Sequence, residues 1–252
     1  RKLDLGYVGL PPVIAGIDKG VQIKCIAGGH MEGTVLLAGD GFRSLDVQKG
    51  DMNATLEQFR GKIVGSPSKG SIHDVIIRDL MKKTDIEVKN FEWADFIPWA
   101  MEDGDIDAAV GTPALAAAVS QTARIIIPPG KLWPNNPSYG IVASHELLED
   151  SPDLIEEFLK LHEDATNLLR RHPEKGAKMV SNAVGIVDEE FILQVYGISP
   201  KYCASLSHEF VSSTLRFIPV LRELGYIARH LTERDIFDRR FINNVHPGEP
   251  HY

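Results

Sequence analysis

A strand, a short helix and a second strand follow one another within residues 3–33, and this unit constrains the fold most strongly. Apolar residues alternate and then run continuously over residues 3–8, which is typical of a strand. A glycine and two prolines follow and favour a helix start, so residues 13–19 are expected to be helical. Gly20 then suits a helix stop before a second apolar run at residues 21–27, which ends at two glycines. Two strands joined by a helix predict a parallel crossover and an α/β fold.

The carboxyl ends of these two strands form the expected binding edge, because ligands of open parallel sheets lie beyond such ends. Tyr7 and Gly9 stand at the first end, and Pro11 opens the helix that follows. Two glycines precede His30 at the second end and allow a ligand to approach the backbone closely. Glu32 follows two positions later, on the same face of the strand. We therefore predict that these five residues contact a ligand.

Composition narrows the class of partner. The chain has 252 residues, which suffices for one large domain or two modest ones and for a sizeable core. The formal net charge of -8 argues against nucleic acid as a partner. An anionic small molecule is still compatible with this charge, because local donors at a site outweigh a distant net charge. No apolar run in the sequence reaches the length of a membrane span.

The start of the chain resembles the nitrate/sulfonate/taurine family of periplasmic solute-binding proteins. These proteins serve ABC importers, and the family includes thiamine-precursor binders. Its pattern is Asp-x-Gly-Tyr-Val-Gly at the end of a strand, then a proline-rich helix start and a glycine. The matching residues are Asp4, Gly6, Tyr7, Val8, Gly9, Pro11, Pro12 and Gly20. The resemblance extends through most of the chain and implies an α/β fold with two lobes, a type II periplasmic-binding-protein clamp with a hinge.

The resemblance also implies how the lobes divide the chain. The strand at residues 34–38 is expected to cross into the second lobe, and the extended segment at residues 139–143 is expected to return. The first lobe is then predicted as residues 1–37 and 145–252, and the second as residues 38–144. Family members have an earlier strand-helix-strand portion of at least about 30 residues. The first lobe is therefore expected to lack its N-terminal portion here, together with any signal or lipid anchor in it.

Two helix starts in the second lobe are expected to face a ligand. Ser71 suits an N-cap because Asp74 stands three positions later and apolar residues follow at helical spacing. Ser68 lies in the turn before this helix, where backbone N–H groups and the helix dipole favour an anion. Thr112 before Pro113 is a strong helix-start signal. The resemblance implies that this second start faces the cleft, although many family members have an acidic residue at the position of Thr112.

Aromatic residues of the second lobe divide into two groups. Trp133 lies in an irregular loop rich in proline and asparagine and is a candidate for lining the ligand site. Trp93 and Trp99 follow or border strands and are expected in the core. A plain core role for Trp133 remains the alternative.

Metal-binding and nucleophilic motifs are not evident in the sequence. The nine histidines are scattered, and none belongs to a group with the spacing of metal ligands. His246 and His251 are expected to be exposed in a polar tail. Cys25 and Cys203 are too few for a disulfide framework and are expected to be structural thiols. We therefore predict no metal and no cofactor.

The leading hypothesis is the extracytoplasmic substrate-binding component of an ABC importer. It would capture a small anionic or zwitterionic solute of the sulfonate, taurine or nitrate class between its lobes, with Glu32 holding the amine of a zwitterion. A thiamine precursor is an alternative ligand. The expected partners are the small-molecule ligand and an importer permease. The protein is expected to be a monomer at the periplasmic or extracellular face of the membrane.

Two other classes of function compete with this hypothesis. Some sulfinate-cleaving and menaquinone-pathway enzymes resemble the same clamp, and an enzyme needs an acid or base with a tuned pKa. Only His30, Glu32 and His73 qualify, and no nucleophile has a visible local base, so we predict a binding protein without catalytic residues. A ligand-sensing domain ranks last because the sequence shows no fused output domain.

Overall fold

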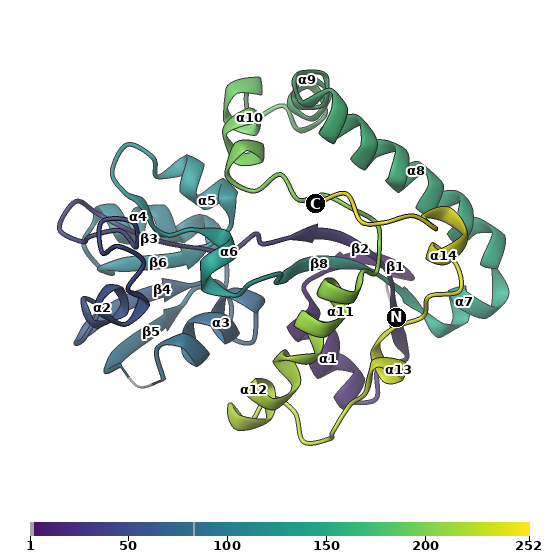
Figure 1. Ribbon diagram of the computed structural model, residues 1–252, viewed down its shortest axis with the longest axis horizontal. Coiled ribbons are helices and arrows are strands. Elements are labelled where there is room, and N and C mark those ends of the chain that lie inside the picture. Colours follow the sequence, from purple (N-terminus) through teal and green to yellow (C-terminus); the bar gives the residue numbers. More distant parts are fainter. Residues whose placement is uncertain (1–2, 83) are drawn as a thin grey trace. The chain divides into compact units, whose positions relative to one another are not determined.

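The computed structural model describes residues 3–82 and 84–252, and it divides the chain into two compact units (Figure 1). Unit 1 comprises Arg1–Glu32, Asn135–Leu193 and Pro200–Tyr252, and unit 2 comprises Gly33–Pro134 and Gln194–Ser199. The unit boundaries differ from the predicted lobes. The strand that was expected to cross lies wholly in unit 2, and the segment that was expected to return lies wholly in unit 1. Gln194–Ser199 also belongs to unit 2, although these residues were predicted to lie in the first lobe.

Unit 1 is built on a three-stranded sheet in the order β1, β8, β2. β1 (Leu5–Val8) and β2 (Ile23–Met31) each pair antiparallel with β8 (Pro137–Ser144). β1 and β2 therefore run parallel to each other within one sheet, as the predicted crossover requires. They share a sheet and are joined through α1 (Leu10–Asp18), but a strand from far along the chain lies between them.

β2 continues through the two glycines that were expected to end it. A Cβ atom on Gly28 would lie 2.5 Å from the carbonyl oxygen of Ser205, and one on Gly29 would lie 2.0 Å from the ring of Tyr139. The chain around Ala204 runs along the edge of β2, where the N–H of Gly28 donates to the Ala204 carbonyl at 2.8 Å. Both glycines thus allow close packing inside the strand and do not terminate it.

Helices cover both faces of this sheet (Figure 1). α8 (Pro152–Arg171), with α9 (Pro173–Val184) packed against it, lies over one face. α1, α11 (His208–Leu215) and α12 (Phe217–Glu223) lie over the other. The remaining helices with residues in unit 1 are α7 (His145–Asp150), α10 (Glu189–Ile198), α13 (Glu233–Ile236) and α14 (Ile242–Val245).

Residues 208–223 form two helices, α11 and α12. α11 ends at Leu215 and α12 begins at Phe217. Pro219 accounts for this break, because a proline has no N–H to donate to the carbonyl four residues earlier and its ring clashes with that carbonyl. Here that carbonyl belongs to Leu215, the last residue of α11.

Unit 2 contains a five-stranded sheet in the order β5, β4, β6, β3, β7. β4 pairs parallel with β5 and β6, whereas β3 pairs antiparallel with β6 and β7. The strands are β3 (Val35–Ala38), β4 (Lys62–Ser66), β5 (Ile86–Asn90), β6 (Ala108–Gly111) and β7 (Arg124–Ile127). The helices are α2 (Met52–Glu57), α3 (Ile72–Leu80), η1 (Ala94–Phe96), α4 (Ile97–Glu102), α5 (Pro113–Ala118) and α6 (Pro129–Leu132).

The core of unit 2 joins this sheet to its helices. Val35 and Leu37 of β3, Ala109 of β6, Ile97 of α4 and Leu115 of α5 belong to one buried cluster. Alternate residues of β3 thus face the same helices, as strand geometry requires. The α/β class expected from the sequence is confirmed in both units. None of the helices within the described ranges combines the length and apolar composition that a membrane span requires.

Candidate functional site

Three side chains form an aromatic row across the sheet of unit 1: Tyr7 on β1, Tyr139 on β8 and His30 on β2. The ring centroids of Tyr7 and Tyr139 lie 5.7 Å apart, edge to face, and those of Tyr139 and His30 lie 6.1 Å apart and stacked. Register explains the row, because Tyr139 stands directly opposite His30 in the β2–β8 pairing. Tyr7 and His30 were expected at a ligand site from their positions near strand ends. Tyr139 could not be expected there, because only the insertion of β8 between the other strands brings it to this position.

The Tyr7 end of the row is open to solvent and supported by α8. The side chain of Tyr7 is 52% exposed. Its hydroxyl lies 3.2 Å from Nδ1 of His162, and its ring lies 6.2 Å from that of Phe158. Phe158 and His162 are four residues apart on α8 and so share one helix face. Burial lowers the pKa of His162 to about 4, against a smaller opposing contribution from the backbone of Gly28, so this imidazole is neutral at pH 7.

The His30 end of the row is enclosed. Nδ1 of His30 lies 3.1 Å from the hydroxyl of Ser138, the residue before Tyr139. The ring of Tyr202, in the segment that runs along the edge of β2, lies 4.4 Å from the His30 ring. The row therefore presents ring faces, the phenol of Tyr7 and the imidazole of His30. Such groups stack on and hydrogen-bond to a small organic molecule.

Glu32 occupies a different position from the one expected of a ligand contact. Its Oε1 accepts a hydrogen bond from the N–H of Asn135 at 3.0 Å, and its Oε2 forms a 2.8 Å ion pair with Nζ of Lys201. Both carboxylate oxygens thus contact protein groups and connect three segments of unit 1, and the contact of Glu32 with a ligand amine remains a prediction. Glu32 and Asn135 each stand at a unit boundary.

Gly9 and Pro11 define the start of α1. Gly9 is the N-cap residue, and its carbonyl accepts a hydrogen bond from the N–H of Val13 at 3.4 Å. Pro11 is buried in the first turn of the helix, where its fixed φ suits the backbone. Its ring packs inside the protein, and a contact between Pro11 and a ligand remains a prediction. The role of Gly9 in binding remains a prediction.

The N-cap predicted at Ser71 is confirmed. The start of this helix differs from the expectation in one respect, because a carboxylate of the chain itself lies there. The hydroxyl of Ser71 accepts a hydrogen bond from the N–H of Asp74 at 3.3 Å. Asp74 is fully buried, and its carboxylate accepts from the N–H of Gly70 at 2.9 Å and pairs with Arg78 at 2.7 Å. A carboxylate of the chain itself thus already uses a donor of this turn. Ser68, in the same turn, is exposed, and its contact with a ligand remains a prediction.

Thr112 and Trp133 complete the candidates in unit 2. Thr112 is the predicted N-cap of α5, and its hydroxyl accepts a hydrogen bond from the N–H of Leu115 at 3.3 Å. Its side chain is exposed, and its role toward a ligand remains a prediction. Trp133 follows α6 and is only 3% exposed. The expectation of an accessible aromatic there is wrong, because the indole is packed as a core side chain.

His73 is a buried neutral imidazole. Its Nδ1 lies 3.1 Å from the hydroxyl of Thr34, and burial lowers its pKa to about 4. A general acid or base working near neutral pH needs a pKa close to that pH. The pKa of His73 is therefore too low for the acid or base that the enzyme hypothesis requires.

A surface cavity of about 1030 Å³ lies elsewhere in unit 1, beside α13. Its charged lining is largely paired, since Arg240 bonds to Asp238 at 2.7 Å and Arg239 bonds to Glu233 at 3.1 Å. These ion pairs use the groups that would otherwise recognise a charged ligand. We therefore place the candidate site at the aromatic row.

The fold of the chain is that of a two-lobed α/β periplasmic binding protein. The chain belongs to the NMT1-like family, whose model matches residues 1–184. No curated protein matches it in sequence.

Three solved structures illustrate the likeness in fold. The ligand-binding component of an ABC-type import system from Staphylococcus aureus, with zinc bound, is 14% identical with a TM-score of 0.78, over 98% of this chain and 82% of that one. The aliphatic sulphonate binding protein SsuA from Escherichia coli is 18% identical with a TM-score of 0.75, over 94% and 76%. The nitrate-binding protein NrtA from Synechocystis PCC 6803 is 12% identical with a TM-score of 0.72, over 96% and 73%. All three are described as binding proteins or binding components.

Proposed function

We propose that this protein is the extracytoplasmic substrate-binding component of an ABC importer. The family match and the fold support this class of function, and the similar structures include binding components for sulphonates and nitrate. The observation that carries the proposal within this chain is the aromatic row. It places Tyr7 and His30, from two strand ends, around Tyr139 of the strand between them. The partners that follow from this role are a small-molecule ligand and an importer permease.

The ligand that we propose is a small organic anion or zwitterion of the sulfonate or taurine class. The row offers the phenol of Tyr7 and imidazole nitrogens as hydrogen-bonding groups, and ring faces on which a carbon skeleton packs. His162 is neutral at pH 7, so recognition here relies on hydrogen bonds more than on fixed charge. An organic solute uses both kinds of contact. Nitrate has no carbon skeleton, so it uses the hydrogen-bonding groups alone and ranks lower.

A planar heterocycle such as a thiamine precursor is the second candidate. The observation that favours it is the stacking of rings at the closed end of the row. There the His30 ring lies 4.4 Å from that of Tyr202 and 6.1 Å from that of Tyr139. Aromatic pairs of this kind contribute about 0.5–1.5 kcal/mol beyond the burial of their area, and a heterocyclic ring packed at the open Tyr7 end would add one more such pair.

A thermal-shift screen of the purified protein tests the proposal. The panel contains alkanesulfonates, taurine, nitrate, aromatic acids and thiamine precursors. A ligand that binds only the folded state adds about 2.7 kcal/mol to its stability at a hundred times its dissociation constant, which raises the Tm. We expect one organic class to raise the Tm and to be recovered unchanged. Consumption of the ligand, or no shift from any compound, would oppose a binding role for this class of solutes.

Variants then locate the site. Tyr7→Phe removes the hydroxyl that faces His162 and is expected to weaken binding of the identified ligand about tenfold, the loss of one hydrogen bond of about 1.4 kcal/mol. Tyr226→Phe, elsewhere in unit 1, is the matched control and should bind normally. Ser68→Ala and Thr112→Ala test the predicted contacts from unit 2. If Tyr7→Phe binds the ligand as tightly as the wild type, the aromatic row is not the binding site.

A further inference from the structure

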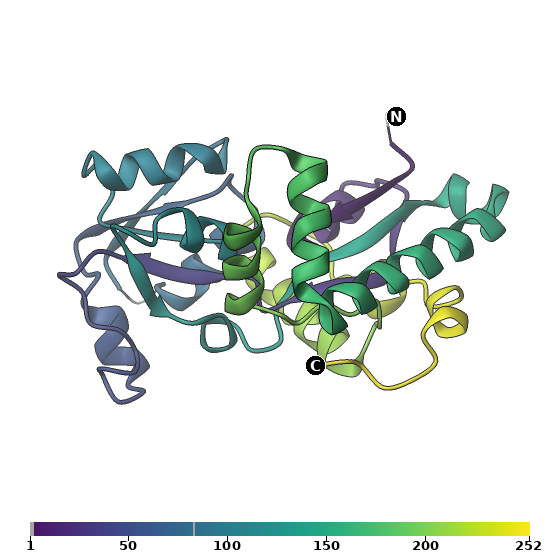
Figure 2. The ribbon, with the colours of Figure 1, turned by 90° about the horizontal axis from the view of Figure 1, so that it is seen from above.

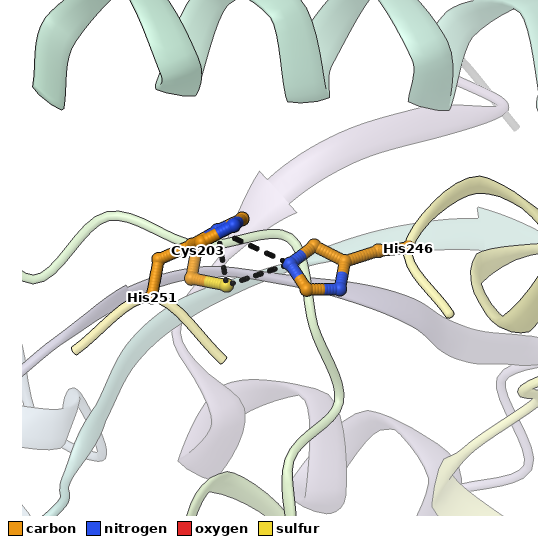
Figure 3. Close-up of side chains that lie close together, drawn as sticks. All are labelled: Cys203, His246 and His251. Carbon is orange, nitrogen blue, oxygen red and sulfur yellow. Dashed lines mark hydrogen bonds between the residues drawn. The ribbon is translucent and has the colours of Figure 1, made fainter. Parts of the chain in front are cut away.

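Three side chains that are distant in sequence meet near the end of the chain (Figure 3). The Sγ atom of Cys203 lies 3.4 Å from Nε2 of His246 and 3.5 Å from Nδ1 of His251. The two imidazole nitrogens lie 3.1 Å apart. Cys203 belongs to the segment along the edge of β2, His246 follows α14, and His251 stands in the C-terminal tail. Each atom of this triangle is a possible metal ligand.

The spacing of these atoms matches the ligand set of a tetrahedral metal ion. Zn²⁺ binds thiolate at about 2.3 Å and imidazole nitrogen at about 2.0–2.1 Å. Tetrahedral angles then place sulfur and nitrogen about 3.6 Å apart, and two nitrogens about 3.3 Å apart. All three separations in the triangle lie within a few tenths of an ångström of these values. An ion can therefore bind with little rearrangement of the three side chains.

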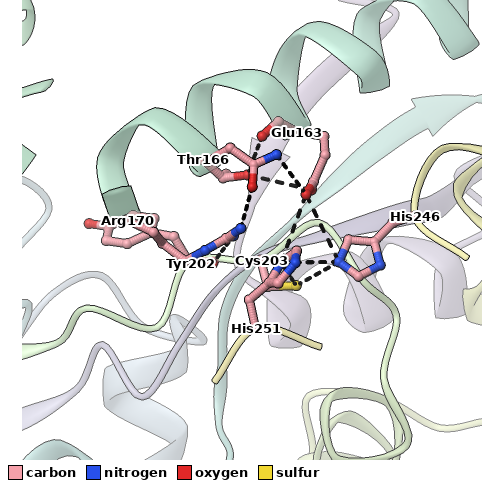
Figure 4. A network of polar contacts seen from close by, with 8 residues as sticks. Glu163, Thr166, Arg170, Tyr202, Cys203, His246 and His251 are labelled. Atoms are coloured by element: carbon pink, nitrogen blue, oxygen red, sulfur yellow. Dashed lines mark hydrogen bonds and ion pairs between the residues drawn. The ribbon is translucent and has the colours of Figure 1, made fainter. Parts of the chain in front are cut away.

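A carboxylate from α8 faces the same triangle (Figure 4). Oε1 of Glu163 lies 3.8 Å from Nδ1 of His251 and 4.0 Å from Nε2 of His246. These distances are roughly half an ångström longer than the spacing of nitrogen and oxygen around a tetrahedral ion. The Nδ2 group of Asn167 donates to the same oxygen at 3.2 Å and orients the carboxylate. A small side-chain rotation would make Glu163 the fourth ligand.

The environment of the triangle is enclosed, as metal sites usually require. Cys203 is 2% exposed, and the side chains of His246 and Glu163 are 5% and 12% exposed. His251 is the outermost ligand, with 35% of its side chain exposed.

We propose that Cys203, His246 and His251 bind a divalent cation of the zinc type, with Glu163 as the fourth ligand. A thiolate, two imidazoles and a carboxylate form a mixed sulfur, nitrogen and oxygen set that suits zinc better than calcium or magnesium, which prefer oxygen. The ion would bind the C-terminal tail to α8 and to the segment along β2 (Figure 2). This segment carries Tyr202, whose ring packs against His30 of the aromatic row. The ion would therefore also order the closed end of the row.

One part of the site is incomplete. Nδ1 of His246 is buried and has no hydrogen-bond partner among the described residues. Ligating histidines usually donate their second ring N–H to a carboxylate or carbonyl group, and loss of such a partner weakens metal binding about 10- to 100-fold. We therefore expect the affinity for zinc to be lower than that of a structural site with a complete second shell.

Equilibrium dialysis of the full chain tests the proposal. The protein is treated with a chelator under reducing conditions and then dialysed against Zn²⁺ alone, and bound metal is measured by atomic emission. We expect one zinc ion per chain for the wild type. Cys203→Ser, His246→Gln and His251→Gln should lose it, and Glu163→Gln should bind at least tenfold more weakly. The exposed His230→Gln is the matched control and should retain full binding.

Cobalt substitution gives a second readout that does not depend on the folding of any variant. A thiolate bound to Co²⁺ produces a charge-transfer absorption band, and tetrahedral Co²⁺ absorbs strongly in the visible range. The second cysteine, Cys25, is fully buried in β2, so a band in the wild type reports Cys203. We expect both features in the wild type. Absence of stoichiometric zinc in the wild type, equal zinc in Cys203→Ser, or Co²⁺ spectra without the thiolate band would each overturn the proposal.

Discussion

The carboxylate of Glu32 accepts a hydrogen bond from the backbone N–H of Asn135 at 3.0 Å and so joins two points at which the chain passes between its units. Lys201 reaches the same carboxylate just after the chain has returned through Ser199. Glu32 and Asn135 both have positive φ, at 58° and 59°. Such backbone conformations cost about 1–3 kcal/mol each for residues other than glycine and persist only where surrounding contacts enforce them. Glu32 therefore connects three segments of unit 1 near the points where the chain enters or leaves unit 2.

Replacement of Glu32 should separate its hydrogen bond from its ion pair. Glu32→Ala is expected to lower the free energy of unfolding by about 1–3 kcal/mol, because it leaves the Asn135 N–H without its acceptor. Glu32→Gln should cost less, because it keeps an acceptor oxygen and loses only the partly exposed ion pair with Lys201. Urea denaturation measures both. Equal stability of Glu32→Ala and the wild type would show that the carboxylate does not hold these segments.

Acidification should destabilise the protein through its buried histidines. The pKa of His73 is about 4 in the folded state against an ordinary value of 6.5, so the unfolded chain binds a proton first as the pH falls. The stabilisation is complete above about pH 6.5 and is lost as the pH drops toward 4. Between pH 7 and pH 5 the loss is about 2 kcal/mol for His73, and a similar loss is expected from His162, whose pKa is also about 4.

The slope of stability against pH, measured by denaturation at several pH values between 7 and 5, checks this prediction. His73→Gln should flatten the slope by about half, whatever its effect on absolute stability. His230→Gln, at an exposed position, should leave the slope unchanged. An unaltered slope in His73→Gln would mean that His73 is not held neutral by burial.

Two glycine substitutions should differ in their effect on stability. Gly28→Ala places a methyl group 2.5 Å from the Ser205 carbonyl oxygen and 2.9 Å from that of Cys203, and neither backbone atom can move without disturbing the edge of β2. A destabilisation of about 1–3 kcal/mol or more is expected from such overpacking. Gly41→Ala meets no atom within 4 Å and should change stability little. Thermal unfolding compares the two, and equal Tm values would contradict the close approach.

The carboxylate at the start of α3 should be essential to unit 2. Asp74 is fully buried and accepts hydrogen bonds from Gly70, Arg78 and Asn90. Asp74→Ala leaves these donors unsatisfied, and the loss of one partner of a buried charged network typically costs about 3–5 kcal/mol. Asp79→Ala, whose ion pair with Lys82 lies near the surface of the same helix, should cost under about 1 kcal/mol. Chemical denaturation would contradict this account if the two variants proved equally stable.

Local signals in the sequence predicted local structure well. The N-caps at Ser71 and Thr112 form the expected hydrogen bonds, because capping depends on residues only three positions apart. Apolar patterns also identified the strands at residues 3–8 and 21–27, and the α/β class follows from these strands and the helix between them. The insertion of β8 between β1 and β2 could not be predicted, because no pattern within residues 3–33 indicates that a later strand will lie between them.

The same difference between local and nonlocal signals applies to the residues of the candidate sites. Tyr7 and His30 could be predicted because each ends a strand, whereas Tyr139 joins them only through the register of β8. The cluster of Cys203, His246 and His251 could not be predicted, because its members are separated by 43 and 48 positions and meet through tertiary packing. His246 and His251 were expected to be exposed because the polar tail was assumed not to pack against the rest of the protein. In the structure α14 packs against α8, and the tail beyond it contacts Cys203 and Ser207.

Isothermal titration of the purified protein with the compound that raises its Tm tests the central claim most directly, provided that the compound is afterwards recovered and identified by NMR. The account predicts one ligand per chain, an affinity reduced about tenfold in Tyr7→Phe, and full recovery of the unchanged compound. Binding that is indifferent to Tyr7→Phe, or conversion of the compound into a product, would contradict the assignment of this chain as an importer's binding component with its site at the aromatic row.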